Sequence, residues 1–235
     1  MRSQIKNRSN LRDVAHRSGV SVATVSRVLN TPNKVTTETR TRVEQAIADL
    51  KFVPSAAARA MNRGNSGIVA ALLPTLDNAI YARVVKGLET RFTNAGLSLI
   101  VAQTGDAPDV ELDRARKMID IGAEALVVVG VTHDPGLYEL IDRTQRPAVA
   151  VSYYDETSRF PTIGYDNWEA ATIAARHYAD LGHRHVGVLH GPVVGNDRTQ
   201  RRLRALQEQD FGIDFAFFEV AHSMAGGRDG IDRLR

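Results

Sequence analysis

The chain lacks cysteine altogether, and no run of apolar residues approaches the roughly 18 that a membrane-spanning helix needs. Without thiols there are no disulfides and no thiolate metal sites. Residues 1–10 are polar and basic, so they lack the apolar centre of a secretory signal. These absences predict a cytoplasmic location with no membrane partner.

Acidic residues are scarce at the start of the chain. Residues 1–65 carry 12 Lys and Arg against 4 Asp and Glu, whereas residues 66–235 carry 18 against 23. The overall composition, 43% apolar and 24% charged, is ordinary for a soluble globular protein long enough for more than one domain. A cationic segment of this size suits the phosphates of nucleic acid, but without a binding motif it is only solvated surface.

Residues 11–30, LRDVAHRSGVSVATVSRVLN, have the spacing of two short helices joined by a tight turn. Apolar residues recur at i, i+3 and i+4 from Leu11, and Gly19 stands where the first helix must end with a positive φ. Ser21 then offers its hydroxyl as the N-cap of the second helix. Any amphipathic helix pair shares this periodicity, but one set of small and apolar residues favours a helix-turn-helix: Ala15, Gly19, Val20, Ser21 and Val25.

The second helix has an apolar side and an outward side. Val25, Val28 and Leu29 face inward, so the rest of its first turns can enter the major groove of DNA. These outward residues are Val22, Ala23, Thr24, Ser26 and Arg27. Arg27 can donate two hydrogen bonds to a guanine edge, while its apolar neighbours can only contact thymine methyls or exclude larger groups. A solvated or internally paired Arg27 is the alternative.

A loop at residues 31–34 leads to a third helix, which Thr36 caps and which runs to about Leu50. Its inner stripe completes a small three-helix core. Thr36, Thr39 and Arg40 at its start can hold a phosphate through hydroxyl and amide groups, or serve as a cap alone. Both interpretations fit the spacing.

Pro54 ends this unit, and residues 55–65 contain an Ala-rich stretch whose single large apolar side chain is Met61. A helix this short is marginal in water and needs a partner, and its small faces permit two copies to approach closely. A lone apolar side chain there can wedge between base pairs in the minor groove. The alternative is an ordinary linker with an incidental methionine.

From residue 66 the pattern changes to apolar strands that alternate with amphipathic helices, which predicts a parallel sheet covered on both faces. The predicted strands are residues 68–73, 97–103, 125–130, 147–151, 185–191 and 216–220. The predicted helices are residues 79–95, 109–121, 135–144, 167–181 and 199–209. Right-handed crossovers then give a doubly wound α/β core, with its ligand outside the carboxyl ends of the strands. The loops at residues 77–81, 152–155 and 191–202 follow strand ends and are candidates to line that cleft.

The first sixty residues and the start of the core resemble the lactose-repressor and galactose-repressor family of bacterial transcription factors. The resemblance rests on the patterns LxDVAxxxGVSxxTVSRVLN and VxxxTRxRVxxAIxxLxFVP, an Ala-rich hinge and a following apolar strand. It implies a homodimer on pseudo-palindromic, double-stranded operator DNA, with recognition helices in two major grooves and paired hinge helices in the minor groove. The implied domains are a helix-turn-helix domain at residues 1–54, a hinge at 55–65, and a core at 66–235. That core is like a periplasmic sugar-binding protein, with two lobes that close on a small effector.

Positions matched to the family supply the implied site residues. The base-reading positions match Val22, Ala23 and Arg27, the DNA-backbone contacts match Ser21, Thr24 and Asn30, and the apolar wedge matches Met61. The effector positions match Asn78, Ile80, Tyr81, Ser152, Tyr153 and Arg202. A guanidinium such as that of Arg202 orients a carboxylate, a phosphate or a pair of hydroxyls, although four arginines on one helix can also be solvated surface. Tyr81 and Tyr153 fit cleft lining and packing equally well.

The sequence departs from the family pattern at three places. Ser152 stands where relatives often have Asp, and Ala205 where they commonly have Gly, so the ligand need not resemble the familiar sugars. The chain also ends inside a helix that follows the last predicted strand. We therefore expect a second lobe without its later strands, in a fragment of a longer product or in a shortened protein, with an open sheet edge and uncovered apolar surface.

The sequence contains no constellation of catalytic residues. GPVVG at residues 191–195 lacks the other residues of a phosphate-binding or dinucleotide-binding loop, and there is no G-x-S-x-G elbow. His183 and His185 alternate, but without a third ligand they are better interpreted as structural or surface residues than as a metal site. The sequence thus predicts no enzyme, cofactor or metal, but a DNA-binding regulator, a repressor controlled by a small molecule such as a sugar. The alternatives are a solute-binding module with a fused basic head, and a truncated DNA binder that has lost its effector response.

Overall fold

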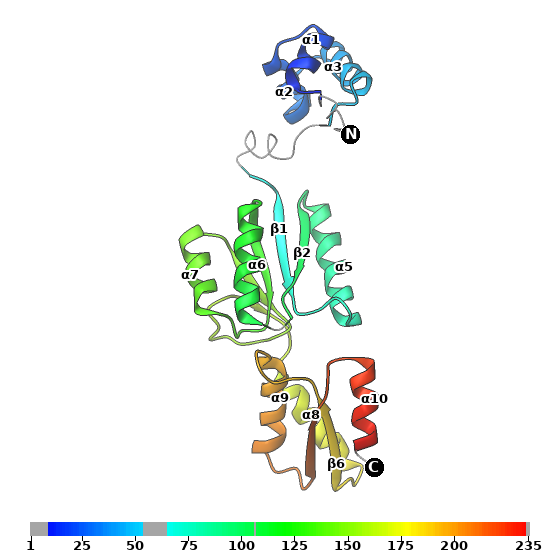
Figure 1. Cartoon of the computed structure of the whole chain (residues 1–235), viewed down its shortest axis with the longest axis vertical. Coiled ribbons are helices and arrows are strands. Elements are labelled where there is room, and N and C mark those ends of the chain that lie inside the picture. Colours follow the sequence, from blue (N-terminus) through cyan, green and yellow to red (C-terminus); the bar gives the residue numbers. More distant parts are fainter. Residues whose placement is uncertain (1–8, 54–64, 106, 234–235) are drawn as a thin grey trace, which may run out of the picture. The chain divides into compact units, whose positions relative to one another are not determined.

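The structure, a computed structural model, describes residues 9–53, 65–105 and 107–233. Met61 and nearly all of the predicted hinge lie outside the described residues. The chain divides into two compact units, residues 1–66 and 67–235 (Figure 1). Within the described ranges, no helix combines the length and the apolar character needed to cross a membrane.

Among its described residues, the first unit has the helices α1 (Leu11–Ser18), α2 (Val22–Asn30) and α3 (Thr37–Asp49), and a 3-10 turn, η1 (Pro32–Lys34), before α3. Their apolar stripes meet in one core, where Val14, Val25 and Val43 are fully buried. Phe52, which follows α3, packs into the same core. The predicted helix-turn-helix and the third helix are confirmed, and the segment expected as a plain loop contains η1.

Capping residues shape the turn between α1 and α2. Asn10 Oδ1 accepts a hydrogen bond from the Asp13 amide at 3.2 Å, and the Asp13 carboxylate accepts one from the Asn10 amide at 2.8 Å. This reciprocal pair is a capping box and starts α1. Gly19, with φ 68°, ends α1, and Ser21 Oγ accepts from the Thr24 amide at 3.1 Å to start α2. A side chain at position 19 would be strained at this φ, so the glycine permits the short turn.

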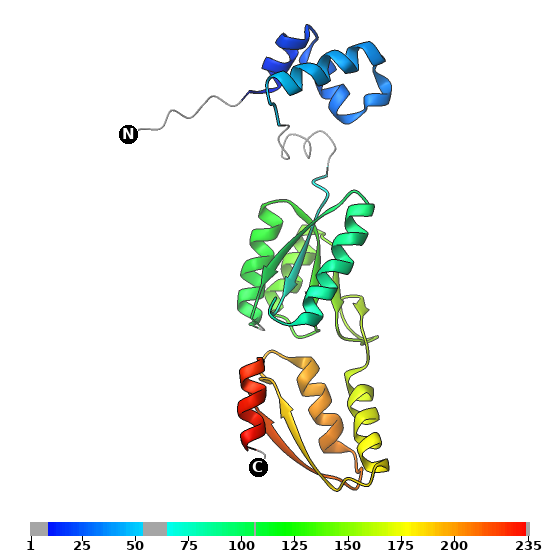
Figure 2. The same ribbon diagram turned by 90° about the vertical axis from the view of Figure 1, so that its right-hand side faces the viewer.

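The second unit begins with a parallel sheet in the order β2-β1-β3-β4-β5. Its strands are β1 (Ile68–Leu73), β2 (Ser98–Gln103), β3 (Ala123–Val129), β4 (Ala148–Val151) and β5 (Thr162–Ile163). Its helices are α5 (Ala79–Asn94), α6 (Pro108–Asp120) and α7 (Pro135–Thr144). Figure 2 shows α5 and α6 on opposite sides of this sheet. Only β5 was not predicted, because two residues carry too little periodicity.

Successive side chains of β1 and β3 point to opposite faces of the first sheet. Leu72 and Leu126 belong to the core under α6 and α7, whereas Leu73 and Val127 belong to the core under α5. Burial on both faces explains why these strands are continuous apolar runs. Because β1 lies between β2 and β3, the crossovers diverge at its carboxyl end, which is where open α/β sheets bind ligands.

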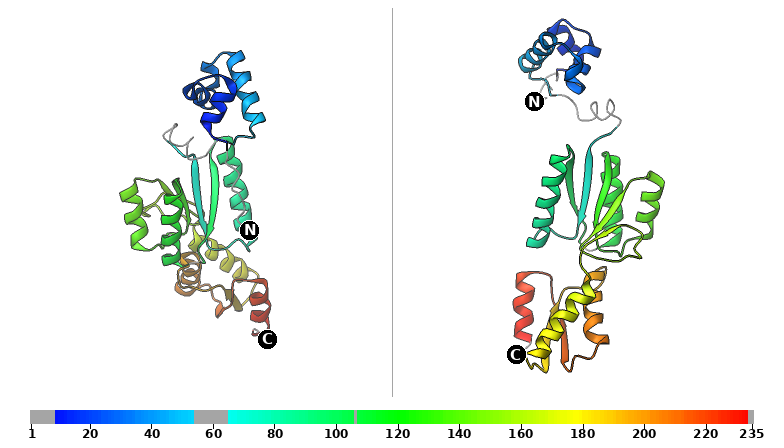
Figure 3. Two further views of the ribbon diagram at one scale, coloured as in Figure 1. Left: turned by 45° about the horizontal axis from the view of Figure 1, so that its top comes forward. Right: turned by 180° about the vertical axis from the view of Figure 1, so that it is seen from behind.

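The second lobe consists of α8 (Asn167–Asp180), β6 (His185–His190), α9 (Asp197–Glu208), β7 (Asp214–Glu219) and α10 (Met224–Arg233). The two strands are parallel, α8 packs beside α9, and α9 and α10 lie on opposite sides of the strands (Figure 3). The apolar side chains that are buried in this lobe are small, namely Ala171, Ala175 and Ala205. Those of β6 and β7 are only half-buried, so this sheet has little cover among the described residues.

Candidate nucleic-acid interface and ligand cleft

The amino-terminal turns of α2 form an exposed surface on the first unit. Ser21, Ala23 and Arg27 are exposed, and Val22 is exposed despite its apolar side chain. Thr24, which was also predicted to face outward, is half-buried, as are Ser26 and Asn30. The structure thus places the three predicted base-reading residues on the exposed side of α2, whose Val25 and Val28 are buried in the core of the first unit.

Hydrogen bonds fix the polar side chains around this surface. Ser21 Oγ lies 2.9 Å from Thr24 Oγ1, and Asn30 Nδ2 donates to the Ser26 carbonyl oxygen at 2.9 Å. The buried Asn30 Oδ1 has no hydrogen-bond partner within the described residues. The Arg27 guanidinium forms neither a hydrogen bond nor an ion pair with any other described residue, so it is available to a ligand.

The start of α3 has the predicted cap. Thr36 Oγ1 accepts from the Thr39 amide at 3.4 Å and donates to Thr39 Oγ1 at 3.0 Å. Arg40 is exposed and pairs with Glu44 one turn later, at 2.7 Å. Capping is therefore observed, and phosphate binding by this turn stays a prediction.

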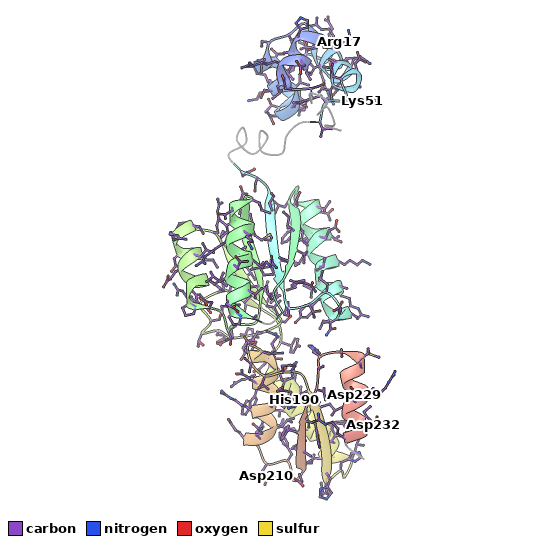
Figure 4. The ribbon with its side chains drawn as sticks, viewed as in Figure 1. Arg17, Lys51, His190, Asp210, Asp229 and Asp232 are labelled. Carbon is purple, nitrogen blue, oxygen red and sulfur yellow. The ribbon has the colours of Figure 1, made fainter. Side chains whose placement is uncertain are left out.

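An exposed ion pair joins α1 to α3. Arg17 Nη2 lies 2.7 Å from Asp49 Oδ2 (Arg17 is labelled in Figure 4), and Gln45 Nε2 donates to Asp49 Oδ1 at 2.9 Å. The hydrogen bonds from Gln45 and then Arg17 lower the pKa of the Asp49 carboxyl. This pair removes one charge of each sign, so the excess of basic over acidic residues in the first unit is unchanged.

The loop after β1 contains the first group of predicted effector residues. Asn78 caps α5, because its Oδ1 accepts from the Ile80 amide at 3.2 Å, and its Nδ2 lies 3.5 Å from His222 Nε2 of the second lobe. Ile80 is 48% exposed, whereas Tyr81 is only 7% exposed and packs in the core under α5. Asn78 therefore faces the second lobe, and Tyr81 serves packing.

The segment after β4 contains the second group. Ser152 has a positive φ of 66°, and its carbonyl oxygen accepts from Asn167 Nδ2 at 3.3 Å. Tyr153 is half-buried, and burial raises the pKa of its hydroxyl; the negative charge of Asp197 acts in the same direction. These residues join the first lobe to the start of α8, so they line the connection between the lobes.

The arginines of α9 have different surroundings. Arg202 Nη1 donates to Asn167 Oδ1 at 3.2 Å, and Arg202 lines a cavity of about 550 Å³ at the carboxyl ends of β6 and β7. Arg201 is exposed and its guanidinium stacks on the Trp168 ring at 4.8 Å. Arg198 is buried, and Arg204 is exposed. The sequence alone could not distinguish arginines on the solvated surface from arginines that line a cavity. In the structure, Arg202 lines the cavity, whereas Arg201 and Arg204 are exposed.

A polar contact fastens the second lobe to the loop after β3. Asp197 Oδ2 accepts hydrogen bonds from the amides of Val131 at 2.5 Å and Thr132 at 2.7 Å. Arg198 Nη1 lies 3.0 Å from Asp197 Oδ1. Gly130 has φ 81°, and a Cβ there would lie 2.3 Å from Arg198 Nη1, so only glycine permits this close approach. The start of α9 is thereby held against the carboxyl end of β3.

A buried pair supports the same loop. His133 Nδ1 lies 2.7 Å from Glu111 Oε2, and the two side chains are 1% and 9% exposed. His133 Nε2 lies 3.2 Å from the Gly130 carbonyl oxygen, and Tyr138 Oη donates to the Val131 carbonyl oxygen at 3.1 Å. The loop that receives Asp197 is therefore shaped by side chains from α6 and α7.

Sequence reasoning did not single out five polar residues at this connection. Asn167, Asp197 and His222 make the contacts between the lobes, and Glu111 and His133 support the loop after β3. Each is a polar residue without a local motif, and its partner is 15 to 144 positions away in the chain. Only their place in the predicted order of elements could have indicated them. Four of the five follow a strand or begin a helix at the end of a sheet where ligands bind. No group of His, Cys, Asp or Glu suited to a metal ion occurs within the described ranges.

Comparison with known proteins agrees with this architecture. Residues 10–55 match the model for bacterial regulatory proteins of the lacI family, and residues 66–230 match the model for periplasmic binding proteins and the sugar-binding domain of that family. The chain is 30% identical over 184 residues to the HTH-type transcriptional regulator GntR of Escherichia coli K12, covering 78% of this chain and 56% of GntR. It therefore spans little more than half of that relative.

Solved structures share the fold. A LacI-family regulator from Silicibacter pomeroyi superposes with a TM-score of 0.83 at 24% identity, covering 96% of this chain and 69% of that one. The lac repressor dimer bound to operator and the anti-inducer ONPF superposes with a TM-score of 0.79 at 21% identity, with coverage of 96% and 69%. A helix-turn-helix unit followed by a two-lobed α/β unit defines the class of regulators that join a DNA-binding head to a periplasmic-binding-protein-like domain. The chain belongs to the lacI family of bacterial regulatory proteins.

Proposed function

We propose that this protein is a sequence-specific repressor that binds double-stranded operator DNA as a homodimer and responds to a small-molecule effector. One observation carries the proposal. Val22, Ala23 and Arg27 stand exposed on the second helix of a helix-turn-helix, and the Arg27 guanidinium has no hydrogen bond or ion pair within the described residues. The cationic character of residues 1–65 supplies attraction to phosphates. Since the relatives are transcriptional regulators, nothing favours catalysis over regulation.

On DNA, the residues divide by chemistry. Arg27 donates to a guanine edge in the major groove, and Val22 and Ala23 contact thymine methyls. The hydroxyl and amide groups around them contact phosphates: Ser21, Thr24, Ser26, Asn30, Thr36 and Thr39. Met61, in a hinge at residues 55–65 that pairs with its copy, inserts between base pairs in the minor groove. The domain boundaries we propose are accordingly 1–54, 55–65 and 66–235.

In the second unit, the effector binds between the lobes. We assign Asn78, Ile80, Ser152, Tyr153 and Arg202 to this site, and Tyr81 to its support from the core under α5. A ligand that binds one arrangement of the lobes more tightly shifts the population toward it, and so changes how the two heads are held. The DNA partner places this activity in the cytoplasm.

Selection of bound sites from random duplexes tests the proposal. We expect enrichment of a pseudo-palindrome at physiological salt, and Arg27→Ala to cost about 1–3 kcal/mol and to relax preference at one base pair per half-site. Arg42→Ala, which removes an exposed charge from α3 of the same unit, is the control and should weaken binding evenly across sequences. Ligand affinity without any preferred duplex would favour a solute-binding module with a basic head instead.

A further inference from the structure

A buried pair in the first lobe, Glu111 and His133, has a defined hydrogen-bond pattern. His133 Nδ1 lies 2.7 Å from Glu111 Oε2, and His133 Nε2 lies 3.2 Å from the Gly130 carbonyl oxygen. The side chains of His133 and Glu111 are 1% and 9% exposed, so water competes little for these contacts. A carbonyl oxygen only accepts hydrogen bonds. His133 Nε2 therefore carries a hydrogen and donates to the Gly130 carbonyl oxygen.

The contact between His133 Nδ1 and Glu111 Oε2 also contains a hydrogen, because two lone pairs would repel each other at 2.7 Å. In one arrangement a cationic imidazole donates to an ionised carboxylate, and in the other a carboxylic acid donates to a neutral imidazole. Both arrangements hold one proton more than an ionised carboxylate and a neutral imidazole do. This proton belongs to the pair as a whole, and it leaves the pair without net charge.

Aromatic rings surround the imidazole of His133. The centroids of the Tyr138 and Phe160 rings lie 5.8 Å and 5.7 Å from that of the imidazole. The charged groups of the neighbouring segments have other partners: Arg159 stacks on the Tyr138 ring at 4.9 Å, Asp134 caps α7, and Asp197 of α9 pairs with Arg198 at 3.0 Å. Loss of the shared proton would therefore leave one net negative charge in a buried site, on the loop that also binds the Asp197 carboxylate.

The same pair shapes the loop that binds the second lobe. The His133 side chain bonds back to Gly130. The two amides between these residues, those of Val131 and Thr132, donate to Asp197 Oδ2 of α9. Gly130 lies so close to α9 that a Cβ on it would be 2.6 Å from both carboxylate oxygens of Asp197. The bond from His133 to Gly130 thus fixes the conformation of the backbone that holds Asp197.

We infer that Glu111 and His133 are positioning residues whose shared proton holds the loop at residues 130–133 in the shape that binds Asp197. Release of this proton at alkaline pH then weakens the hold of the first lobe on the second. Without the proton, the imidazole has one hydrogen for two oxygen partners, so one of its two contacts becomes repulsive. The inference concerns the connection between the lobes and does not depend on the proposed function.

The alkaline stability of the second lobe in the full chain tests this inference. In an unfolded chain above about pH 7, glutamate is ionised and histidine is neutral, so folding takes up one proton and stability falls as the proton is released at higher pH. Denaturant titrations followed by the fluorescence of Trp168 on α8 give the folded-to-unfolded ratio. Between about pH 7 and about pH 9.5, we expect this ratio to fall about 5- to 50-fold more in the wild type than in Glu111→Gln.

Glu111→Gln is the decisive variant because it keeps the shape of the side chain. Its amide donates to His133 Nδ1 with a hydrogen that does not titrate, so the contact should persist at alkaline pH. Glu139→Gln, which changes an exposed acid on α7, is the control and should keep the wild-type profile. A Glu111→Gln profile that is parallel to that of the wild type would show that the pair only supports the fold, and would overturn the inference.

Nuclear magnetic resonance on the wild type gives an answer that does not require any variant to fold. The nitrogen-15 shifts of the His133 ring report which nitrogens carry a hydrogen, and the amide signals of Val131 and Thr132 report the contact with Asp197. We expect Nε2 to carry a hydrogen at about pH 7, and the two amide signals to move together with the ring signals as the pH rises. An Nε2 without a hydrogen at that pH overturns the inference, and so do amide signals that stay fixed while the ring titrates.

Discussion

In the first lobe, five parallel strands bury leucines and valines on both faces, and Leu72, Leu126 and Leu137 are at most 1% exposed. In the second lobe, two strands of similar composition leave Val188 and Phe217 half-buried. The residues that are most buried at the start of α9 are polar, including Asn196 and Thr199. The same kind of element is therefore held by apolar packing in one lobe and by hydrogen bonds in the other.

The difference follows from the number of neighbours that each strand has. A central strand such as β1 has a strand on either side and helices on both faces, so each of its side chains is enclosed. In the second lobe each strand has one strand neighbour among the described residues. Polar contacts to the first lobe, above all those of Asp197, therefore contribute more to the position of the second lobe. The second lobe is thus the one whose position is controlled by polar groups.

The largest expected effect comes from matched leucine truncations in the two lobes. Leu72→Ala should lower the free energy of unfolding by about 2–5 kcal/mol, because the cavity it leaves is fully enclosed. Leu189→Ala on the half-buried β6 should cost about 1 kcal/mol, because less apolar surface is lost. Denaturant titrations followed by circular dichroism check the first value. The fluorescence of Trp168, the single tryptophan of the chain, reports on the second lobe. If the two substitutions lowered the free energy of unfolding equally, the two lobes would not differ in how much apolar packing stabilises them.

A smaller effect is expected from Asp197→Ala. This change leaves two partly buried amides without their acceptor and the buried Arg198 without its counter-charge, which should cost about 1–3 kcal/mol. The loss should appear in the Trp168 fluorescence transition more than in the transition of the first lobe. Glu208→Ala, an exposed acid on the same helix, is the control. A midpoint for Asp197→Ala that matches this control would show that the polar contact does not hold the second lobe.

The same contrast explains how much the sequence could predict. Apolar periodicity located β1 to β4 of the first lobe to within two residues at either end, since burial on both faces leaves a continuous apolar run, as in Leu126 to Val129. Capping chemistry likewise predicted Gly19, Ser21 and Thr36, because each acts on atoms within three residues of itself. Local rules therefore sufficed for the first unit and the first lobe.

The polar contacts between the lobes could not be predicted in this way. Asp197 contacts amides 65 and 66 positions earlier, and nothing in the residues around it distinguishes it from an ordinary helix-start aspartate. Arg202 was predicted from its position in the family pattern, but its contact with Asn167, 35 positions earlier, forms only in the folded chain. Side-chain pairing across a fold leaves no periodic trace in the sequence.

The smallest expected effect is acid sensitivity at the connection between the lobes. Hydrogen bonds from the Thr157 side chain and amide lower the pKa of the Asp155 carboxyl below its ordinary value of 3.8. A lowered folded-state pKa means that this contribution to stability is complete above the unfolded pKa and is lost as the pH falls through the folded pKa. Because Asp155 is only partly buried, we expect about 0.5 kcal/mol or less, confined to pH values below about 4. Asp155→Asn should lower the free energy of unfolding at pH 7 by that small amount, and should flatten the pH dependence of the Trp168 transition in the acid window. An identical acid profile in the variant and the wild type would show that the connection between the lobes does not depend on this carboxylate.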